Sequence, residues 1–348
     1  MRDRGGAYPP LVELTLARLR EFVREPEALF WIVVFPILMA CALGIAFRSR
    51  GDEPLVVGVV QGAGSAQVAE ALGRSAAVRV EPVPPGRIAL ALQRAEVQVV
   101  VEGGAPPTYH LDPTRAESRL ARRTVDDLLQ RAAGRTDAFT GRDAPVEAIG
   151  SRYIDWLVPG LLGMNVMSTG LWGLGFSIVQ ARTRKLLKRL VASPMRRRDY
   201  LLAQVLGRLV FLVIEAGALL AFGALAFGVP MRGSGALLAA TCLCGALAFG
   251  GVGLLVASRA RTLEAVSGLV NLVMLPMWLL SGVFFSASNF PDAMQPVIQA
   301  LPLTALNDAL RAVMLEGAGL GQVASELALM SAWGLGCFAV ALRVFRWR

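Results

Sequence analysis

The sequence predicts an α-helical membrane protein with six transmembrane helices and a small α/β domain between the first and second helices. The composition of the chain and the arrangement of its apolar and polar residues predict this class. Of the 348 residues, 55% are hydrophobic and only 18% are charged, whereas soluble domains carry about 25% charged residues. The apolar residues gather in runs of about 20, the length that an α-helix needs to cross a bilayer. A polar stretch of about 100 residues separates the first run from the others.

Six apolar runs have the length of membrane spans. They cover residues 29–47, 156–179, 205–227, 236–257, 265–285 and 323–342. Residues 1–28 precede the first span, and within them residues 10–25 have the pattern of an amphipathic helix. Such a helix either lies at the membrane surface or simply leads into the span. Segment 287–321 contains three prolines and is too short and broken for a span, so we expect a re-entrant or interfacial segment there.

Basic residues indicate how the spans are oriented. Thirteen Arg and Lys residues lie after the second, fourth and sixth spans, against two in the short connections of the opposite side. Short cytoplasmic loops carry this excess in membrane proteins. We therefore expect both termini and the loop 180–203 in the cytoplasm, with residues 48–152 and 287–321 on the other side of the membrane. The net charge of +9 then indicates contact with membrane lipid and not with nucleic acid.

The external segment 48–152 alternates strand and helix patterns. Strands are expected at 55–60, 78–83, 97–101 and 108–111, and helices at 65–73, 86–94 and 114–133. Strands that alternate with helices predict a small α/β domain. Gly62 and Gly64 follow the first strand, but the third glycine of the dinucleotide fingerprint is missing, so we interpret them as a tight turn.

Residues that carry catalytic chemistry are scarce in this chain. His110 is the only histidine, and the four cysteines lie in apolar runs without the spacing of metal ligands. The sequence contains no Gly-x-x-x-x-Gly-Lys-Ser/Thr loop, which would hold the phosphates of ATP. We therefore predict that this chain is not an enzyme and binds no cofactor or metal itself.

Three polar residues are expected inside the membrane: Asn165 in the second span, Glu215 in the third and Asn271 in the fifth. A charged or strongly polar side chain is costly there and should face protein or a cavity. Two interpretations are open. The three residues line a transport path or the seam between two copies, or they make hydrogen bonds that hold the helices together.

The loop 180–203 combines a basic run with an apolar stripe. Leu186, Leu187, Leu190 and Val191 recur at helical spacing, and Pro194 ends the pattern. A short amphipathic helix of this kind docks a soluble partner or rests on lipid. A solvated loop on the cytoplasmic side is the simpler alternative.

Four stretches together resemble the ABC-2-type transporter permeases, the membrane subunits of bacterial ABC exporters. They are Arg-Glu-Pro-Glu-Ala-Leu-Phe-Trp from 24 with Phe-Pro at 35–36, Val-Pro-Gly-Leu-Leu-Gly-Met at 158–164, Lys-Arg-Leu-Val-Ala-Ser-Pro at 188–194, and Leu-Ser-Gly-Val-Phe-Phe at 280–285 with Leu-Pro-Leu-Thr from 301 and Asp-Ala-Leu-Arg from 308. Their order and spacing hold from about residue 20 to the C-terminus. The loop departs from the family pattern, because Gln180-Ala-Arg-Thr-Arg-Lys lacks the acidic residues and the glycine that usually open it.

The resemblance implies the permease subunit of an exporter that moves a hydrophobic or amphipathic substrate, such as a drug-like molecule or a lipid. A separate ABC ATPase would bind ATP and Mg²⁺, and a second permease chain, identical or different, would complete the pathway. The resemblance places ATPase coupling at Arg184, Lys185, Leu187, Lys188, Arg189, Leu190, Ser193 and Pro194.

Two other functions stay open on the sequence. One is a lipid or polysaccharide exporter of the same architecture. The other is a membrane receptor or assembly factor that uses the external domain, residues 48–152, to bind a partner. In an exporter, that domain would bind substrate, a periplasmic adaptor or nothing. The basic loop and segment 287–321 favour transport, because a receptor needs neither.

Overall fold

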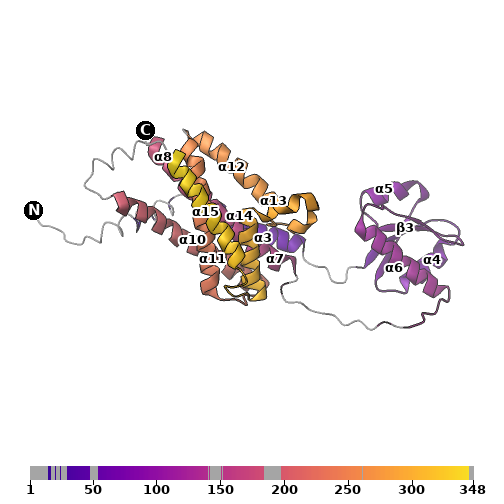
Figure 1. Ribbon diagram of the computed structural model, residues 1–348. Helices are drawn as coiled ribbons and strands as arrows, with labels where there is room; N and C mark the ends of the chain where they lie inside the picture. The colour runs from indigo at the N-terminus through magenta and orange to yellow at the C-terminus, as the bar shows by residue number, and fades with distance from the viewer. Residues whose placement is uncertain are drawn as a thin grey trace, which may run out of the picture. The chain divides into compact units, whose positions relative to one another are not determined.

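The computed structural model describes residues 15–16, 20, 24, 30–47, 54–139, 141, 150, 152–183, 197–260 and 262–344. The chain divides into two compact units (Figure 1). One consists of residues 1–48 and 147–348, and the other of residues 49–146. The first unit is helical, and the second contains the sheet. The amphipathic helix predicted at 10–25 lies almost entirely outside the described residues.

Most helical segments of the first unit follow the apolar runs of the sequence. They are η1 (Phe30–Val34), α3 (Phe35–Ala46), α7 (Tyr153–Gly170), η3 (Leu171–Phe176), α8 (Ser177–Thr183), α10 (Arg197–Phe227), α11 (Gly235–Arg259), α12 (Leu263–Leu280) and α15 (Ala324–Val344). Within the described residues, five helices are long and apolar enough to cross a membrane. The first predicted span forms η1 and the 12-residue α3, which is shorter than these five. The count of six spans therefore stays a prediction.

The fifth predicted span, residues 265–285, is too long at its C-terminal end. Helix α12 ends at Leu280, and Gly282 adopts a left-handed conformation with φ of +69°. Glycine takes this conformation without steric penalty and commonly ends helices. Residues 281–285 consequently form a turn that leaves the helix axis, which the hydropathy of Val283, Phe284 and Phe285 conceals.

Short helices connect α12 to α15. They are η4 (Ala287–Asn289), η5 (Asp292–Met294), α13 (Gln295–Gln299), α14 (Pro302–Arg311) and η6 (Ala312–Glu316). Pro296 and Pro302 stand in the first turns of α13 and α14, where the missing N–H is tolerated. Nearly every residue of α14 is buried, because this helix packs against α7, α11 and α15. Its position in a bilayer stays a prediction.

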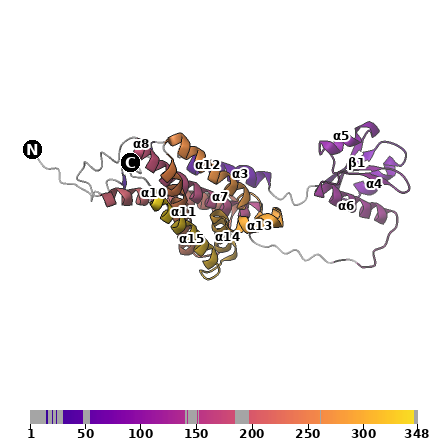
Figure 2. The same cartoon turned by 45° about the horizontal axis from the view of Figure 1, so that its top comes forward.

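Helix α11 packs against α7, η3 and α15, and α11 and α15 lie side by side in both views (Figures 1 and 2). Glycines allow the close approach: a Cβ on Gly251 would lie 2.6 Å from the carbonyl oxygen of Gly334 on α15. The helices differ in how much of them is covered. Buried positions make up 65% of the most apolar stretch of the span Tyr153–Gln180, but only 22% of that in α12 and 17% of that in α15. Helices α12 and α15 therefore present most of their apolar surface outward.

The second unit is a four-stranded sheet with helices on both faces. Its elements are β1 (Leu55–Val60), α4 (Ser65–Gly73), β2 (Val78–Val83), η2 (Pro85–Arg87), α5 (Ile88–Gln93), β3 (Val99–Glu102), β4 (Thr108–His110) and α6 (Ala116–Ala132). The strand order is β2-β1-β3-β4, with β2, β1 and β3 parallel and β4 antiparallel. All the strands and helices lie within two residues of their predicted ends.

Alternation along the strands distributes the core over two faces. Val57 and Val59 of β1 pack with Leu72 of α4 and Val125 of α6. Val60 of β1 instead packs toward Ala91 of α5, in the cluster of the opposite face. Successive side chains of a strand point to opposite faces, and a parallel sheet is normally covered on both. This explains the almost unbroken valine runs of β1 and β3.

Candidate functional site

The loop implied for ATPase coupling lies outside the described residues. Helix α8 ends at Thr183 and α10 begins at Arg197, so all eight coupling residues, from Arg184 to Pro194, fall in between. The two flanking helices are described, and both continue into the core of the helical unit.

A polar contact joins α7 to α10 deep in this core. Glu215 of α10 is only 2% exposed, and its Oε2 accepts a hydrogen bond of 2.7 Å from the hydroxyl of Thr169 on α7. Arg208, two turns earlier on α10, donates from Nε to the carbonyl oxygen of Thr169 at 2.9 Å. Two side chains of one helix thus hold the hydroxyl and the backbone of a single residue on the other.

The backbone of α7 is adapted to this contact. Immediately after Gly170 the helix widens into the π-helical segment η3, a form that is rare and often found at functional sites. The guanidinium carbon of Arg208 lies 2.7 Å from where a Cβ on Gly173 would be. Glycine is therefore required at 173 for Arg208 to reach Thr169.

The other two polar residues predicted in the membrane occupy different environments. Asn165 is buried on α7, one turn before Thr169, so it lies on the same side of that helix. Asn271 is exposed on α12. The structure thus places Asn165 and Glu215 inside the helical unit and Asn271 on its surface.

Sequence reasoning missed a second polar contact, made by α14. Asn307 donates from Nδ2 to the carbonyl oxygen of Ser281 at 2.8 Å. Arg311 is 5% exposed; it donates to the carbonyl oxygen of Gly282 and lies 3.4 Å above the ring centroid of Trp156 on α7. The available signal was the spacing of Asn307 and Arg311, one helical turn apart in a mostly apolar segment.

The family of this chain follows from its sequence across these helices. The profile of the ABC-2 type transporter family matches residues 119–315, more than half of the chain. The chain belongs to the ABC-2 type transporter family. The matched region begins in α6 and ends in η6, and it contains both polar contacts of this ABC-2 chain.

Individual relatives of the ABC-2 chain are distant. The inner membrane transport permease YhhJ of Escherichia coli is 26% identical over 173 residues, which cover 49% of this chain and 46% of the relative. The probable multidrug ABC transporter permease YbhR of E. coli is 27% identical over 175 residues, covering 50% and 48%. ABC transporter G family member 20 of Dictyostelium discoideum is 29% identical over 172 residues, covering 49% and 23%. The match spans about half of the two bacterial permeases and less of the third protein.

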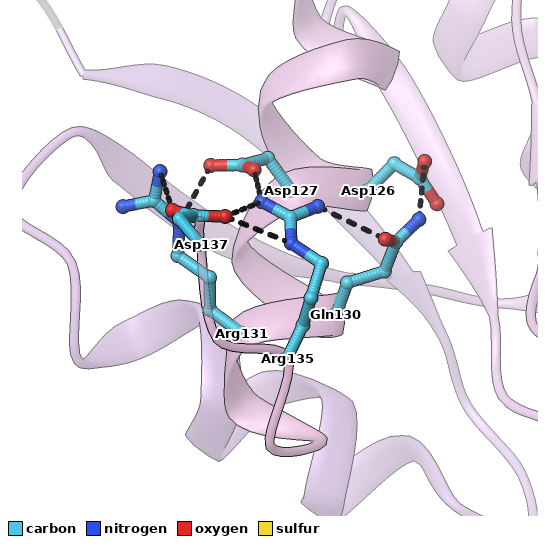
Figure 3. A network of polar contacts seen from close by, with 6 residues as sticks. All are labelled: Asp126, Asp127, Gln130, Arg131, Arg135 and Asp137. Atoms are coloured by element: carbon cyan, nitrogen blue, oxygen red, sulfur yellow. Dashed lines mark hydrogen bonds and ion pairs between the residues drawn. The ribbon is translucent and has the colours of Figure 1, made fainter. Parts of the chain in front are cut away.

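In the second unit of the ABC-2 chain, polar side chains gather around the C-terminal end of α6 (Figure 3). Arg135 bonds Asp127, the side-chain oxygen of Gln130 at 2.9 Å and Asp137 at 3.1 Å, while Arg131 pairs with both aspartates at 3.0 Å. The hydrogen bond from Arg135 lowers the pKa of Asp127 below its ordinary value. The two Arg and the charges of Asp127 and Asp137 balance each other, so this network fixes the chain after α6.

The remaining titratable groups of the sheet are paired as well. Tyr109 donates to Asp126 at 2.9 Å, and burial together with this hydrogen bond raises the tyrosine pKa to about 12. His110 of β4 lies 3.1 Å from Glu102 of β3, a neighbour supplied by strand pairing. Over the described residues, no group of three or more His, Cys, Asp or Glu side chains could hold a metal ion. The four cysteines are free thiols.

Proposed function

We propose that this chain is the transmembrane permease subunit of an ATP-driven exporter in a bacterial inner membrane, with both termini in the cytoplasm. The observation that carries the proposal is the family match over residues 119–315, which takes in the helical core from α7 to η6. A separate ABC ATPase supplies the energy by binding ATP and Mg²⁺. This chain supplies the membrane path together with a second permease chain.

Helices α8 and α10 carry the ATPase motion in this proposal. They flank the loop 184–196, so a displacement of that loop pulls on both. The hydrogen bonds from Arg208 and to Glu215 tie α10 to Thr169 on α7. Helices α7 and α10 would therefore respond to the ATPase as one body. Glu215 would thus serve transport through the same hydrogen bond that holds α7 and α10 together.

The exposed Asn271 on α12 marks the proposed seam with the second permease chain. An amide side chain facing lipid lacks hydrogen-bond partners, whereas facing another helix it can find them. Two-fold symmetry would bring the same face of α12 from both chains together. An identical second chain is the simpler case, and a related but different chain is the alternative.

The proposed substrate is hydrophobic or amphipathic. One relative, YbhR, is a probable multidrug ABC transporter permease. A hydrophobic molecule would also reach the apolar outward surface of α12 and α15 through the bilayer. A lipid or polysaccharide is the alternative cargo. The second unit, residues 49–146, would then contact a periplasmic adaptor or the substrate outside the membrane.

Co-purification with an ATPase tests the proposal. The chain is solubilised in mild detergent from its own host, and its partners are identified by mass spectrometry. We expect an ABC ATPase with the wild type, and its loss from the double variant Arg189→Glu and Leu190→Asp, which disrupts the coupling loop.

The chain offers a matched control for this experiment. Arg119 and Leu120 form the same dipeptide on the exposed face of α6, where Leu120 is 61% exposed. The variant Arg119→Glu with Leu120→Asp makes identical chemical changes in the other unit, and it should retain the ATPase. Recovery of other membrane or periplasmic proteins but of no ATPase, in the wild type, would instead support a receptor or assembly factor.

A further inference from the structure

The C-terminal end of α12 is held by side chains of two other helices. Three backbone carbonyl oxygens in the turn that follows α12 accept these hydrogen bonds: Ser281 accepts from Asn307 at 2.8 Å, Gly282 accepts from Arg311, and Phe284 accepts from the hydroxyl of Tyr153 at 2.9 Å. Carbonyls at a helix C-terminus have no partner within the helix and need one from elsewhere. Here α14 and α7 provide the donors.

Asn307 and Arg311 act on the same face of α14, because they are four residues apart. The Arg311 side chain is 6% exposed, and its nearest carboxylate, Asp308, lies 3.6 Å away and is 57% exposed. The guanidinium therefore interacts mainly with the carbonyl oxygen of Gly282 and with the ring of Trp156. One side chain thereby links the end of α12 to the beginning of α7.

Glycines on α7 make room for the contact among α7, α14 and the end of α12, which we call the joint. A Cβ on Gly160 would lie 2.6 Å from the carbonyl oxygen of Val283, and a Cβ on Gly163 would collide with the side-chain oxygen of Asn307. The end of α12 and the polar face of α14 thus press directly on the backbone of α7. The whole contact lies in the helical unit, where α7, α12 and α14 appear in Figure 1.

The joint is closed but its polar groups are incompletely paired. Within the described chain, five buried polar atoms of these segments lack a hydrogen-bond partner: Trp156 Nε1, Ser281 Oγ, Thr304 Oγ1, Asn307 Oδ1 and Arg311 Nε. An unpaired buried polar group destabilises the state that contains it. If the joint opened, water would provide hydrogen-bond partners for these atoms. The difference in free energy between the closed joint and the open one is therefore smaller than it would be for a joint made of apolar side chains.

Helix α12 packs along one face only, where four side chains from Val266 to Met277 are buried in the core. Only 22% of its apolar window is buried, and Leu272, Leu275 and Leu279 are each more than half exposed. A helix that packs on one face only can tilt about that face when the contacts at one of its ends are released. Release of the α14 side chains would therefore free the C-terminal end of α12 to move.

We propose that Asn307 and Arg311 form a latch that positions the C-terminal end of α12 against α7, and that each transport cycle must release it. This proposal rests on the proposed function, because it assigns the latch to a permease driven by an ATPase. Asn307 and Arg311 are positioning residues in this scheme: they act through α12 and need not touch the substrate.

Locking the latch tests whether it has to open. In a chain without its native cysteines, Ser281→Cys and Asn307→Cys are bridged by a short bis-methanethiosulfonate reagent that dithiothreitol removes. The readout is ATP hydrolysis by the purified complex with its ATPase, which needs no known substrate. We expect hydrolysis to fall about tenfold or more after bridging and to recover on reduction, because the cycle stalls when α12 cannot move.

A second bridge controls for the reagent. Cys244 of α11 lies 3.5 Å from the hydroxyl of Ser331 on α15, in a seam packed with glycines. Bridging Cys244 to Ser331→Cys, with the other three cysteines removed, should leave ATP hydrolysis unchanged. If the Ser281–Asn307 bridge also leaves it unchanged, although mass spectrometry shows complete bridging, α12 and α14 form a static joint and the latch is refuted.

Thiol labelling tests the hold of the latch without any ATPase. Val283 is fully buried beside the joint, so Val283→Cys in the purified chain should react slowly with N-ethylmaleimide. Arg311→Met keeps the length of the side chain but removes its donors, and should speed labelling about tenfold, the equivalent of one lost charged hydrogen bond.

A cysteine at Leu320, which is well exposed, should label equally fast with and without Arg311→Met. Equal rates at Val283→Cys would refute the latch. If no ATPase accompanies the chain, the proposed function fails and the transport role of the latch fails with it. Faster labelling in Arg311→Met would then show separately that Arg311 still holds the end of α12.

Discussion

The hydrogen bond between Thr169 and Glu215 provides a quantitative test of the helical core. Thr169→Val removes the hydroxyl and preserves the branched shape, so packing changes little. Interhelical hydrogen bonds in membrane proteins average about 0.6 kcal/mol. Here the loss should be larger, because Glu215 is 2% exposed and its other oxygen, Oε1, has no hydrogen-bond partner among the described residues. Leaving the buried carboxyl without this partner should cost about 1.5–3 kcal/mol.

The chain carries its own reporters for this measurement. Cys242 and Cys337 are buried free thiols, so a maleimide dye that fluoresces on reaction will report thermal unfolding in detergent. A loss of stability of this size should lower the midpoint temperature of unfolding by roughly 3–10 °C. Thr169→Ser keeps the hydroxyl and should shift it much less. A midpoint for Thr169→Val within about one degree of the wild type would refute the reasoning.

A double-variant cycle separates the pair from its surroundings. If Thr169 and Glu215 stabilise each other, the effects of Thr169→Val and Glu215→Gln will not add, and the coupling should be about 0.5–3 kcal/mol. Additive effects would mean that each residue acts through other neighbours, such as Arg208, and the proposed rigid connection between α7 and α10 would lose its basis.

Two further predictions concern packing and pH. Gly170→Ala should destabilise the chain by about 1–3 kcal/mol, because the new Cβ would lie 2.6 Å from Cβ of Phe249 and 3.0 Å from the backbone nitrogen of Gly250. A Cβ at Gly217 would meet nothing within 4 Å, so Gly217→Ala should be neutral or stabilising in the same thermal assay. Equal effects of the two substitutions would contradict the close packing at Gly170. Asp127→Asn should lower the thermal stability of residues 49–146 near neutral pH. Because the hydrogen bond from Arg135 lowers the pKa of folded Asp127, its contribution is present above the unfolded pKa of about 4 and disappears as the pH falls through the folded value. The difference between wild type and Asp127→Asn should shrink on acidification, and a difference independent of pH would exclude this origin.

The sequence by itself located the five long apolar helices and the four strands, and it indicated the family. Bilayer thickness requires about 20 apolar residues in a row, and side-chain alternation marks a strand, so both are written locally in the chain. Hydropathy predicted a helix through residue 285, but α12 ends at Leu280. The left-handed backbone conformation of Gly282 ends the helix although the residues after it are apolar. The coupling residues 184–194 were named from the sequence alone and stay a prediction.

Only the tertiary structure decided which polar residues meet. Thr169 and Glu215 are 46 residues apart, and Trp156 and Arg311 are further apart still, so no local periodicity links them. Helix packing brings these pairs together, and glycines at 160, 163 and 173 make the space that each contact needs. Glu215 was identified as costly from its place in an apolar run, but its partner became visible only in the packed core. In the sequence, Arg311 looked like an ordinary loop charge. Its burial comes from the helices that pack around it, which its own position in the sequence does not reveal.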